Sequence, residues 1–182
     1  MRVLCRYIVV EDTYGVGFHK KILNRLYSSN LISCKDFIVE RIDPGPCNHA
    51  FIRKLKGHAL RKGCNKVQTL FVIDVESTYK RDESDILNHF KHENKSPIKL
   101  FNPYIVLVNP NHEKWLCIGL LGNLRRCKNN FRHIFRQRFQ REYRKMYLDT
   151  MAEKVEIRNL MKDKDFSRYL SILRKMCKEK SY

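Results

Sequence analysis

Residues 3–11 read Val3-Leu4-Cys5-Arg6-Tyr7-Ile8-Val9-Val10-Glu11, an almost continuous apolar run that ends in an acid. Such a run, rich in β-branched side chains, is typical of a strand buried on both faces of a parallel sheet. A second strong run spans residues 67–75, and shorter ones span 35–42 and 104–108. The chain therefore carries several candidate strands for one buried sheet.

Helical spacing of apolar residues separates these runs. It covers residues 18–27, 49–62, 82–92 and 113–121, and Gly122 follows the last of them. Strands that alternate with helices indicate an open, mostly parallel sheet flanked by helices. The sequence therefore predicts an α/β domain over residues 1–122.

The strand pattern stops after residue 124. Aromatic residues then recur every four positions, at Phe131, Phe135, Phe139, Tyr143 and Tyr147. This period predicts one long helix over residues 129–151, with the aromatic stripe packed against the domain. Two shorter helices are expected at 155–161 and 166–177. Residues 123–182 would then form a basic helical extension.

Charge is the most distinctive property of the composition. The 182 residues include 37 Lys and Arg against 19 Asp and Glu, a net charge of +18. The commonest intracellular polyanion that could neutralise such a surplus is nucleic acid, DNA or RNA. A solubilising surface or an anionic membrane face is the alternative.

The basic residues are densest at 123–147, where only Glu142 is acidic. The expected contacts to phosphates, without sequence specificity, are Arg125, Arg126, Lys128, Arg132, Arg136, Arg138, Arg141, Arg144 and Lys145. No apolar run approaches the ~18 residues of a membrane span, so we expect no membrane partner.

The chain has seven cysteines and no pair spaced C-x-x-C. An odd number of cysteines without a C-x-x-C pair argues against a disulfide framework, and their spacing fits no familiar zinc site. We therefore expect reduced cysteines that act as small apolar side chains, and a cytoplasmic protein.

Four acids lie at or just after the ends of predicted strands. Glu11 follows the first strand, Asp74 and Glu76 end the third, and Glu113 follows the Asn109-Pro110 turn. If the strands are parallel, these carboxylates meet at one edge of the sheet. Like charges held together favour a hard divalent cation, Mg²⁺ or Mn²⁺. Taken singly, each acid could instead be an ordinary turn or helix N-terminal residue.

Two of these elements resemble the Toprim fold. Ile8-Val9-Val10-Glu11 and Val72-Ile73-Asp74-Val75-Glu76 are similar to its Glu after the first strand and its D-x-D after the third. The segment from Asn109 to Leu116 resembles the N-P-x-x-E-x-W-L motif of RloB-like Toprim proteins, which are associated with restriction and defence loci, in the branch that also holds OLD-type nucleases. Asp12 stands where the family has Gly, and Glu76 where it has the second Asp.

The resemblance implies a Mg²⁺-dependent phosphoryl-transfer site. Asp74 and Glu76 would hold the metal, Glu113 would be a third ligand or an orienting carboxylate, and Glu11 a general acid/base or a further ligand. His112 is a candidate substrate contact, and Trp115 a candidate core anchor.

The sequence thus predicts a small metal-dependent nuclease that acts on DNA or RNA. One alternative is a non-catalytic nucleic-acid-binding protein with a degenerate Toprim-like domain, which Asp12 and Glu76 would favour. Another is a homodimer or a subunit of a larger assembly, with the aromatic stripe as its interface.

Overall fold

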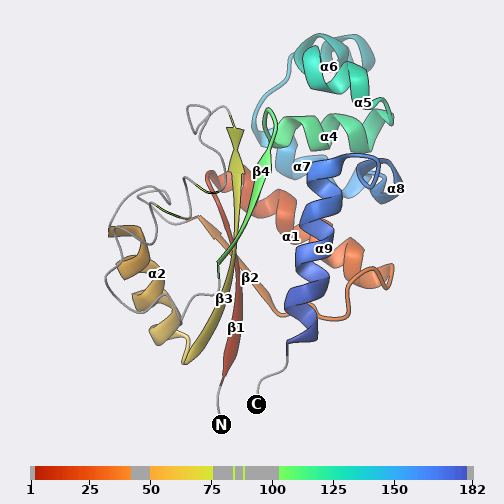
Figure 1. The fold of residues 1–182 in the computed structure, drawn as a ribbon. Coiled ribbons are helices and arrows are strands. Elements are labelled where there is room, and N and C mark those ends of the chain that lie inside the picture. Colours follow the sequence, from red (N-terminus) through yellow and green to blue (C-terminus); the bar gives the residue numbers. More distant parts are fainter. Residues whose placement is uncertain (1–2, 42–49, 76–83, 85–87, 89–102, 180–182) are drawn as a thin grey trace.

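A four-stranded parallel sheet forms the centre of the computed structural model, which describes residues 3–41, 50–75, 84, 88 and 103–179 (Figure 1). The strands are β1 (Leu4–Val10), β2 (Phe37–Arg41), β3 (Lys66–Asp74) and β4 (Pro103–Val108), in the order β2-β1-β3-β4. In register, Val10 lies beside Arg41 and Val72, and Asp74 lies beside Val108. The predicted fold class, an open parallel sheet flanked by helices, is confirmed.

The helices in chain order are α1 (Thr13–Ser28), α2 (Ala50–Arg61), α4 (His112–Leu121), α5 (Leu124–Asn129), α6 (Phe131–Phe139), α7 (Met146–Thr150), α8 (Ile157–Leu160) and α9 (Lys164–Lys178). A short 3-10 helix, η3 (Ala152–Lys154), joins α7 to α8. The predicted helix at 82–92 falls largely on residues that the structure does not describe.

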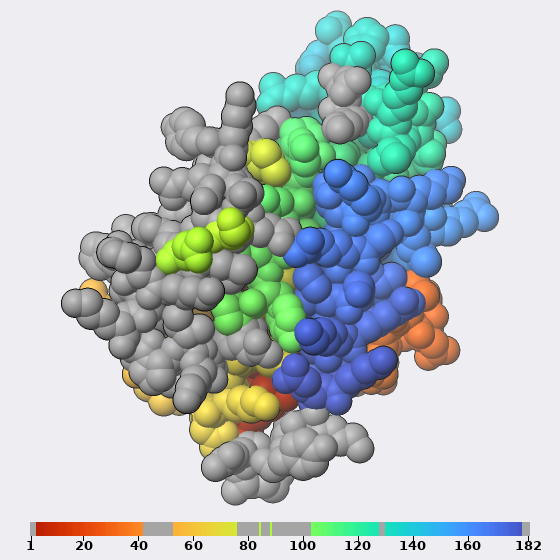
Figure 2. Space-filling model, viewed as in Figure 1, coloured from red at the N-terminus to blue at the C-terminus, as the bar shows by residue number. Residues whose placement is uncertain are grey.

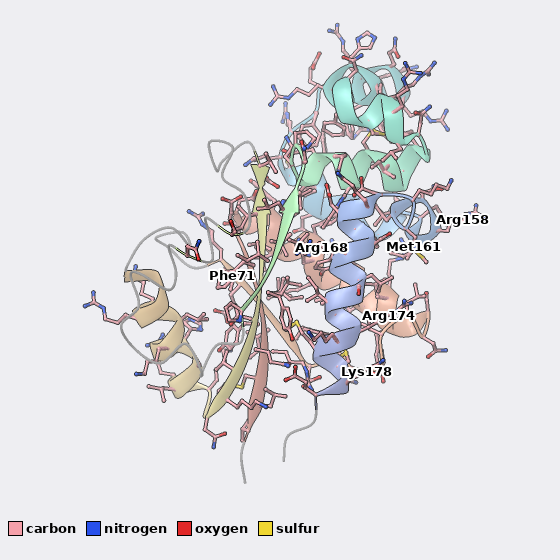
Figure 3. The ribbon with its side chains drawn as sticks, in the orientation of Figure 1. Phe71, Arg158, Met161, Arg168, Arg174 and Lys178 are labelled. Carbon is pink, nitrogen blue, oxygen red and sulfur yellow. A yellow bond between two sulfur atoms is a disulfide. The ribbon has the colours of Figure 1, made fainter. Side chains whose placement is uncertain are left out.

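The two faces of the sheet bury different halves of each strand, because successive side chains point to opposite faces. Ile8 and Val72 face the larger core, whereas Tyr7 and Phe71 face the smaller one, which Leu55 of α2 covers. Figure 3 shows Phe71 on the α2 side of the sheet and Arg174 and Lys178 along α9. Burial on both faces is what the sequence predicted for β1, and β3 shares it.

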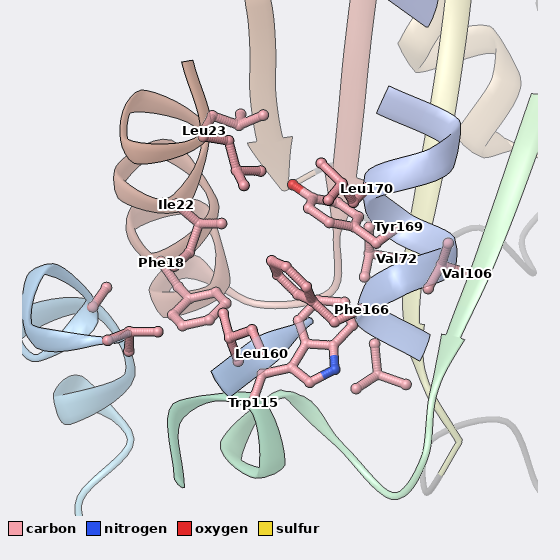
Figure 4. Close-up of a cluster of buried hydrophobic side chains, with 14 of the residues drawn as sticks. Phe18, Ile22, Leu23, Val72, Val106, Trp115, Leu160, Phe166, Tyr169 and Leu170 are labelled. Atoms are coloured by element: carbon pink, nitrogen blue, oxygen red, sulfur yellow. The ribbon is translucent and has the colours of Figure 1, made fainter. Parts of the chain in front are cut away.

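Trp115 of α4 anchors the larger core and is fully buried, as predicted. Its ring centroid lies 5.2 Å from that of Phe166 and 5.5 Å from that of Tyr169, both on α9. Figure 4 shows these rings together with Phe18 of α1 in one cluster. A single core therefore joins α1 and α4 to α9, on both sides of residue 122.

Close backbone contacts bring the later helices onto this core. A methyl group added at Gly119 of α4 would lie 2.2 Å from Cγ1 of Val155, just before α8. Glu156 N also donates to Gly119 O at 2.9 Å. Gly122 ends α4 in a left-handed conformation with φ 70°, which glycine adopts without steric cost.

The single long helix predicted for residues 129–151 is wrong. α6 ends at Phe139, where Gln140 adopts φ 51°, and the chain turns back before α7 begins at Met146. The turn lets the aromatic stripe pack on itself, with the ring centroid of Phe135 5.4 Å from that of Tyr147. The period of four therefore reflects one aromatic cluster around the buried Phe135, built from two helices and the segment between them.

The expectation of reduced cysteines is also wrong. Cys5 is bonded to Cys64, Cys34 to Cys177, and Cys117 to Cys127. Each pair has a Cα–Cα separation of 5.4 to 5.7 Å, within the ordinary range for a disulfide. Cys47 lies outside the described residues. The bridges link β1 to the loop before β3, the α1–β2 segment to the end of α9, and α4 to α5.

Within the described part of the chain, no helix is long and apolar enough to cross a membrane.

Candidate active site

The order β2-β1-β3-β4 creates a topological switch point between β1 and β3. β1 connects to β2 on one side, whereas β3 connects to β4 on the other, and in open α/β sheets ligands bind at the carboxyl ends of the strands that flank such a point. Glu11 and Asp74 lie at this edge, after β1 and at the end of β3. Glu11 Oε2 accepts a hydrogen bond from Asp74 N at 2.7 Å, so the first two predicted acids meet as expected.

Asp74 is held by the start of α4. Its Oδ1 accepts from His112 N at 3.0 Å and lies 2.5 Å from His112 Nδ1. Burial alone would lower the pKa of His112, but the Asp74 carboxylate outweighs that effect and raises it. The imidazolium therefore balances the charge of Asp74. His112 is only 2% exposed, and its predicted contact to substrate stays a prediction.

A chain of buried hydrogen bonds continues from His112 into the core. His112 Nε2 lies 3.0 Å from His19 Nε2, and His19 Nδ1 lies 2.9 Å from the Tyr169 hydroxyl. Burial and the neighbouring His112 lower the pKa of His19 well below its usual range, and burial raises the pKa of Tyr169. His19 and Tyr169 are thus neutral, and they connect the Asp74 carboxylate to α1 and α9.

Glu113, the third acid, follows His112 on the first turn of α4. Its pKa is raised by burial, with a further contribution from the Asp74 carboxylate. Burial and Glu113 in turn raise the pKa of Tyr143, from the segment between α6 and α7. Glu113 therefore interacts electrostatically with Asp74 at the edge of the sheet and with Tyr143 of the aromatic stripe.

Asp12 and Lys145 complete the surroundings of these acids. Asp12 caps α1, since its Oδ1 accepts from Gly15 N at 2.6 Å, and its Oδ2 lies 3.4 Å from Lys145 Nζ. Lys145 also lowers the pKa of Glu113, although burial outweighs that effect. Asp12 thus acts locally as a helix cap, and its ion pair with Lys145 lies beside the site.

Three of the four predicted acids are therefore brought together, at one edge of the sheet. Glu76 lies outside the described residues. Among the described residues, no three or more His, Cys, Asp or Glu side chains lie close enough together to hold a metal ion. Carboxylates are the ligands that hard cations prefer, and after burial the Asp74 carboxylate also contributes to the raised pKa of Glu113.

The predicted phosphate contacts lie on the surface of α5, α6 and the segment before α7. Lys128 has no described side chain. The others are exposed, namely Arg125, Arg126, Arg132, Arg136, Arg138, Arg141, Arg144 and Lys145. Figure 2 shows this region, in green to teal, at the end of the molecule where α4 lies, above the blue residues of α9. Lys145 belongs to this basic surface and also forms the ion pair with Asp12 beside the acids.

Sequence reasoning missed His19 and Tyr169 as parts of the site. His19 is followed directly by Lys20 and Lys21, so it did not stand out as a buried residue, and Tyr169 lies 150 positions further along the chain. Lys145 was predicted as a phosphate contact but not as a neighbour of the acids. The only signal for His19 was its place on the buried side of α1, next to Phe18.

Comparison with protein-family models, with curated proteins and with solved structures finds no match to this chain.

Proposed function

We propose that this protein is a Toprim-like, metal-dependent nuclease that cleaves phosphodiester bonds in DNA or RNA. The observation that carries the proposal is the meeting of Glu11, Asp74 and Glu113 at the switch point of the sheet. Carboxylates gathered where parallel strands end, next to a strongly basic surface, suit a reaction at a phosphate.

In this proposal Asp74 and Glu113 would hold Mg²⁺ or Mn²⁺, and Glu76 stays a predicted ligand. The bound ion would supply the Lewis acidity that offsets negative charge on the phosphate and activates water. Glu11 fixes the end of β3 by accepting the Asp74 amide hydrogen, and His112 fixes the Asp74 carboxylate. Both keep an acid in place before substrate arrives.

The basic residues bring the substrate to this edge. Lys145 lies 3.4 Å from Asp12 and is 60% exposed, so a phosphate can reach its ammonium group from solvent. The exposed arginines of α5 and α6 extend the positive surface away from the acids. Such contacts bind the backbone regardless of sequence and weaken as salt rises.

Cleavage of labelled DNA and RNA tests the proposal. We expect cleavage with Mg²⁺ or Mn²⁺, none with EDTA, and none by Asp74→Asn with either metal. Glu156→Gln is the matched control, since it removes an exposed carboxylate that pairs only loosely with Arg158, at 3.9 Å. Cleavage that persists in Asp74→Asn would refute the site.

One observation favours the second candidate, a non-catalytic nucleic-acid-binding protein. His112 pairs with Asp74 and its pKa is raised, so the imidazolium already balances the carboxylate charge that a metal ion would otherwise neutralise. Salt-dependent binding without cleavage under any divalent metal would establish this alternative.

A further inference from the structure

A cavity of about 310 Å³ opens between the C-terminal end of α4 and the helices α5 and α6. One part of its lining is apolar and consists of Leu121, Cys127 and Ile134. Its volume is at the lower end of the range of small-ligand sites, roughly 300 Å³ and above. It therefore has room for one flat, partly apolar group.

The walls of this cavity are held in place. Cys127 is buried and bonded to Cys117, so α5 is covalently attached to α4. Asn123, which also lines the cavity, caps α5 by accepting from Arg126 N at 3.0 Å. The cavity is thus formed before any ligand arrives.

The rest of the lining is polar and basic. Arg126 and Arg138 supply guanidinium groups, and Asn123 and Gln137 supply amides. An apolar wall suits the face of a nucleobase, amides suit its hydrogen-bonding edge, and guanidinium groups suit phosphates or stack on the base. Together these groups match the chemistry of a single nucleotide.

We propose that this cavity takes one unpaired base of a single-stranded nucleic acid, with neighbouring phosphates at Arg126 and Arg138. A duplex keeps its bases stacked and paired, so it cannot fill the cavity without extruding one. The inference rests on the proposed function in taking nucleic acid as the ligand, and it narrows the substrate to single strands or unpaired segments.

The position of the cavity relates it to the acids. Leu121 and Glu113 lie on the same helix, and 121 minus 113 is eight residues. At about 1.5 Å per residue, these two positions on α4 are about 12 Å apart. The bound base would therefore lie within a few nucleotides of the bond that reaches the acids.

A second hollow, of about 560 Å³, lies against α6 and shares Gln137 with the first. It includes Glu142, whose Oε1 lies 3.2 Å from Arg136 Nε. All its lining side chains are polar or charged, and its carboxylate would repel a phosphate. The first cavity is therefore the better site for a base.

Binding of single strands that lack one base tests the inference. We would measure fluorescence anisotropy in EDTA with a labelled single strand just long enough to span the basic surface, so that a shift in register would lose phosphate contacts. A series of the same strand carries one abasic nucleotide at each position in turn. Loss of the base that fills the cavity should weaken binding about tenfold, with little effect elsewhere. DNA and RNA strands are separate arms, and the matching duplex should show no such position.

Two single substitutions provide the matched comparison. Arg126→Gln should weaken binding of the intact strand and reduce the effect of the abasic position. Arg125→Gln makes the same charge change on the same helix outside the cavity, so it should leave that effect intact. Equal tolerance of abasic nucleotides at every position, or equal behaviour of the two variants, would overturn the inference.

The measurement separates this inference from the proposed function. A position-specific loss in EDTA supports the cavity even if no metal produces cleavage, and in that case only the nuclease proposal fails. Cleavage without any position-specific loss refutes the cavity alone.

Discussion

Replacement of Lys114 by methionine should strongly destabilise the protein. The Lys114 side chain is 4% exposed, and its Nζ lies 2.9 Å from Asp163 Oδ2 and 2.7 Å from Asp165 Oδ2. Lys114→Met keeps most of the apolar stem but removes the ammonium group. The two carboxylates, 4% and 13% exposed, would then face each other without a cation.

The expected loss follows from what those carboxylates also do. Asp163 caps α9 and accepts from Trp115 Nε1 at 3.0 Å, and Asp165 accepts from Asn109 N at 3.1 Å. The carboxylates therefore cannot turn away to solvent without breaking the contact between α4 and α9. Removal of one partner from a buried ion pair costs about 3–5 kcal/mol, and we expect that loss in the free energy of unfolding.

Urea denaturation followed by circular dichroism measures this loss. Lys164→Met is the matched control, because Lys164 is an exposed residue at the start of the same helix, and it should change stability by less than about 0.5 kcal/mol. Asp165→Asn in the Lys114→Met background should restore part of the stability, since one uncompensated charge disappears. A loss below about 1 kcal/mol for Lys114→Met alone would refute the argument.

Three further predictions concern other parts of the fold. Because the folded pKa of His112 is raised, its stabilising contribution is complete below about pH 6.5 and disappears as pH rises through the folded value. His112→Asn should therefore cost more unfolding free energy at pH 5.5 than at pH 8.5, and an equal or opposite difference would contradict this assignment. Replacement of both Cys34 and Cys177 by serine removes a link across 143 positions and should lower the free energy of unfolding by about 2–5 kcal/mol in chemical denaturation. An unchanged midpoint would show that this bridge is absent, and seven reactive thiols in the unreduced, denatured protein would show that all the bridges are. Gly119→Ala should lower the free energy of unfolding by about 1–3 kcal/mol because its methyl group would clash with Val155. Gly57→Ala, with its nearest neighbour at 3.7 Å, should be neutral or stabilising, and the reverse order in thermal melts would refute the packing.

The strands and the meeting of the acids were predictable from the sequence. The apolar runs at β1 and β3 are short and rich in β-branched residues, which favours buried strands, and in a parallel sheet their ends share one edge. Glu11 and Asp74 therefore had to approach each other once β1 and β3 became neighbours. The helix α4 and its end at Gly122 followed from apolar spacing and a terminal glycine.

The break after α6 and the disulfides were not predictable in the same way. The aromatic period is the same whether the stripe lies on one helix or folds back at Gln140, because the choice depends on tertiary packing. Seven cysteines without a motif do not specify a pairing, and Cys34 meets Cys177 only because α9 returns to the α1–β2 segment. His19 was hidden for the same reason, since its partners His112 and Tyr169 lie 93 and 150 positions away.

The most direct test of the metal site is an anomalous-scattering map from crystals soaked in Mn²⁺. The account predicts one strong peak at the carboxyl edge of β1 and β3, with carboxylate oxygens of Asp74 and Glu113 at about 2.0–2.2 Å. The same soak of Asp74→Asn should lose that peak. A map of the wild-type protein with no peak at this edge, in crystals that admit Mn²⁺ elsewhere, would contradict the central claim.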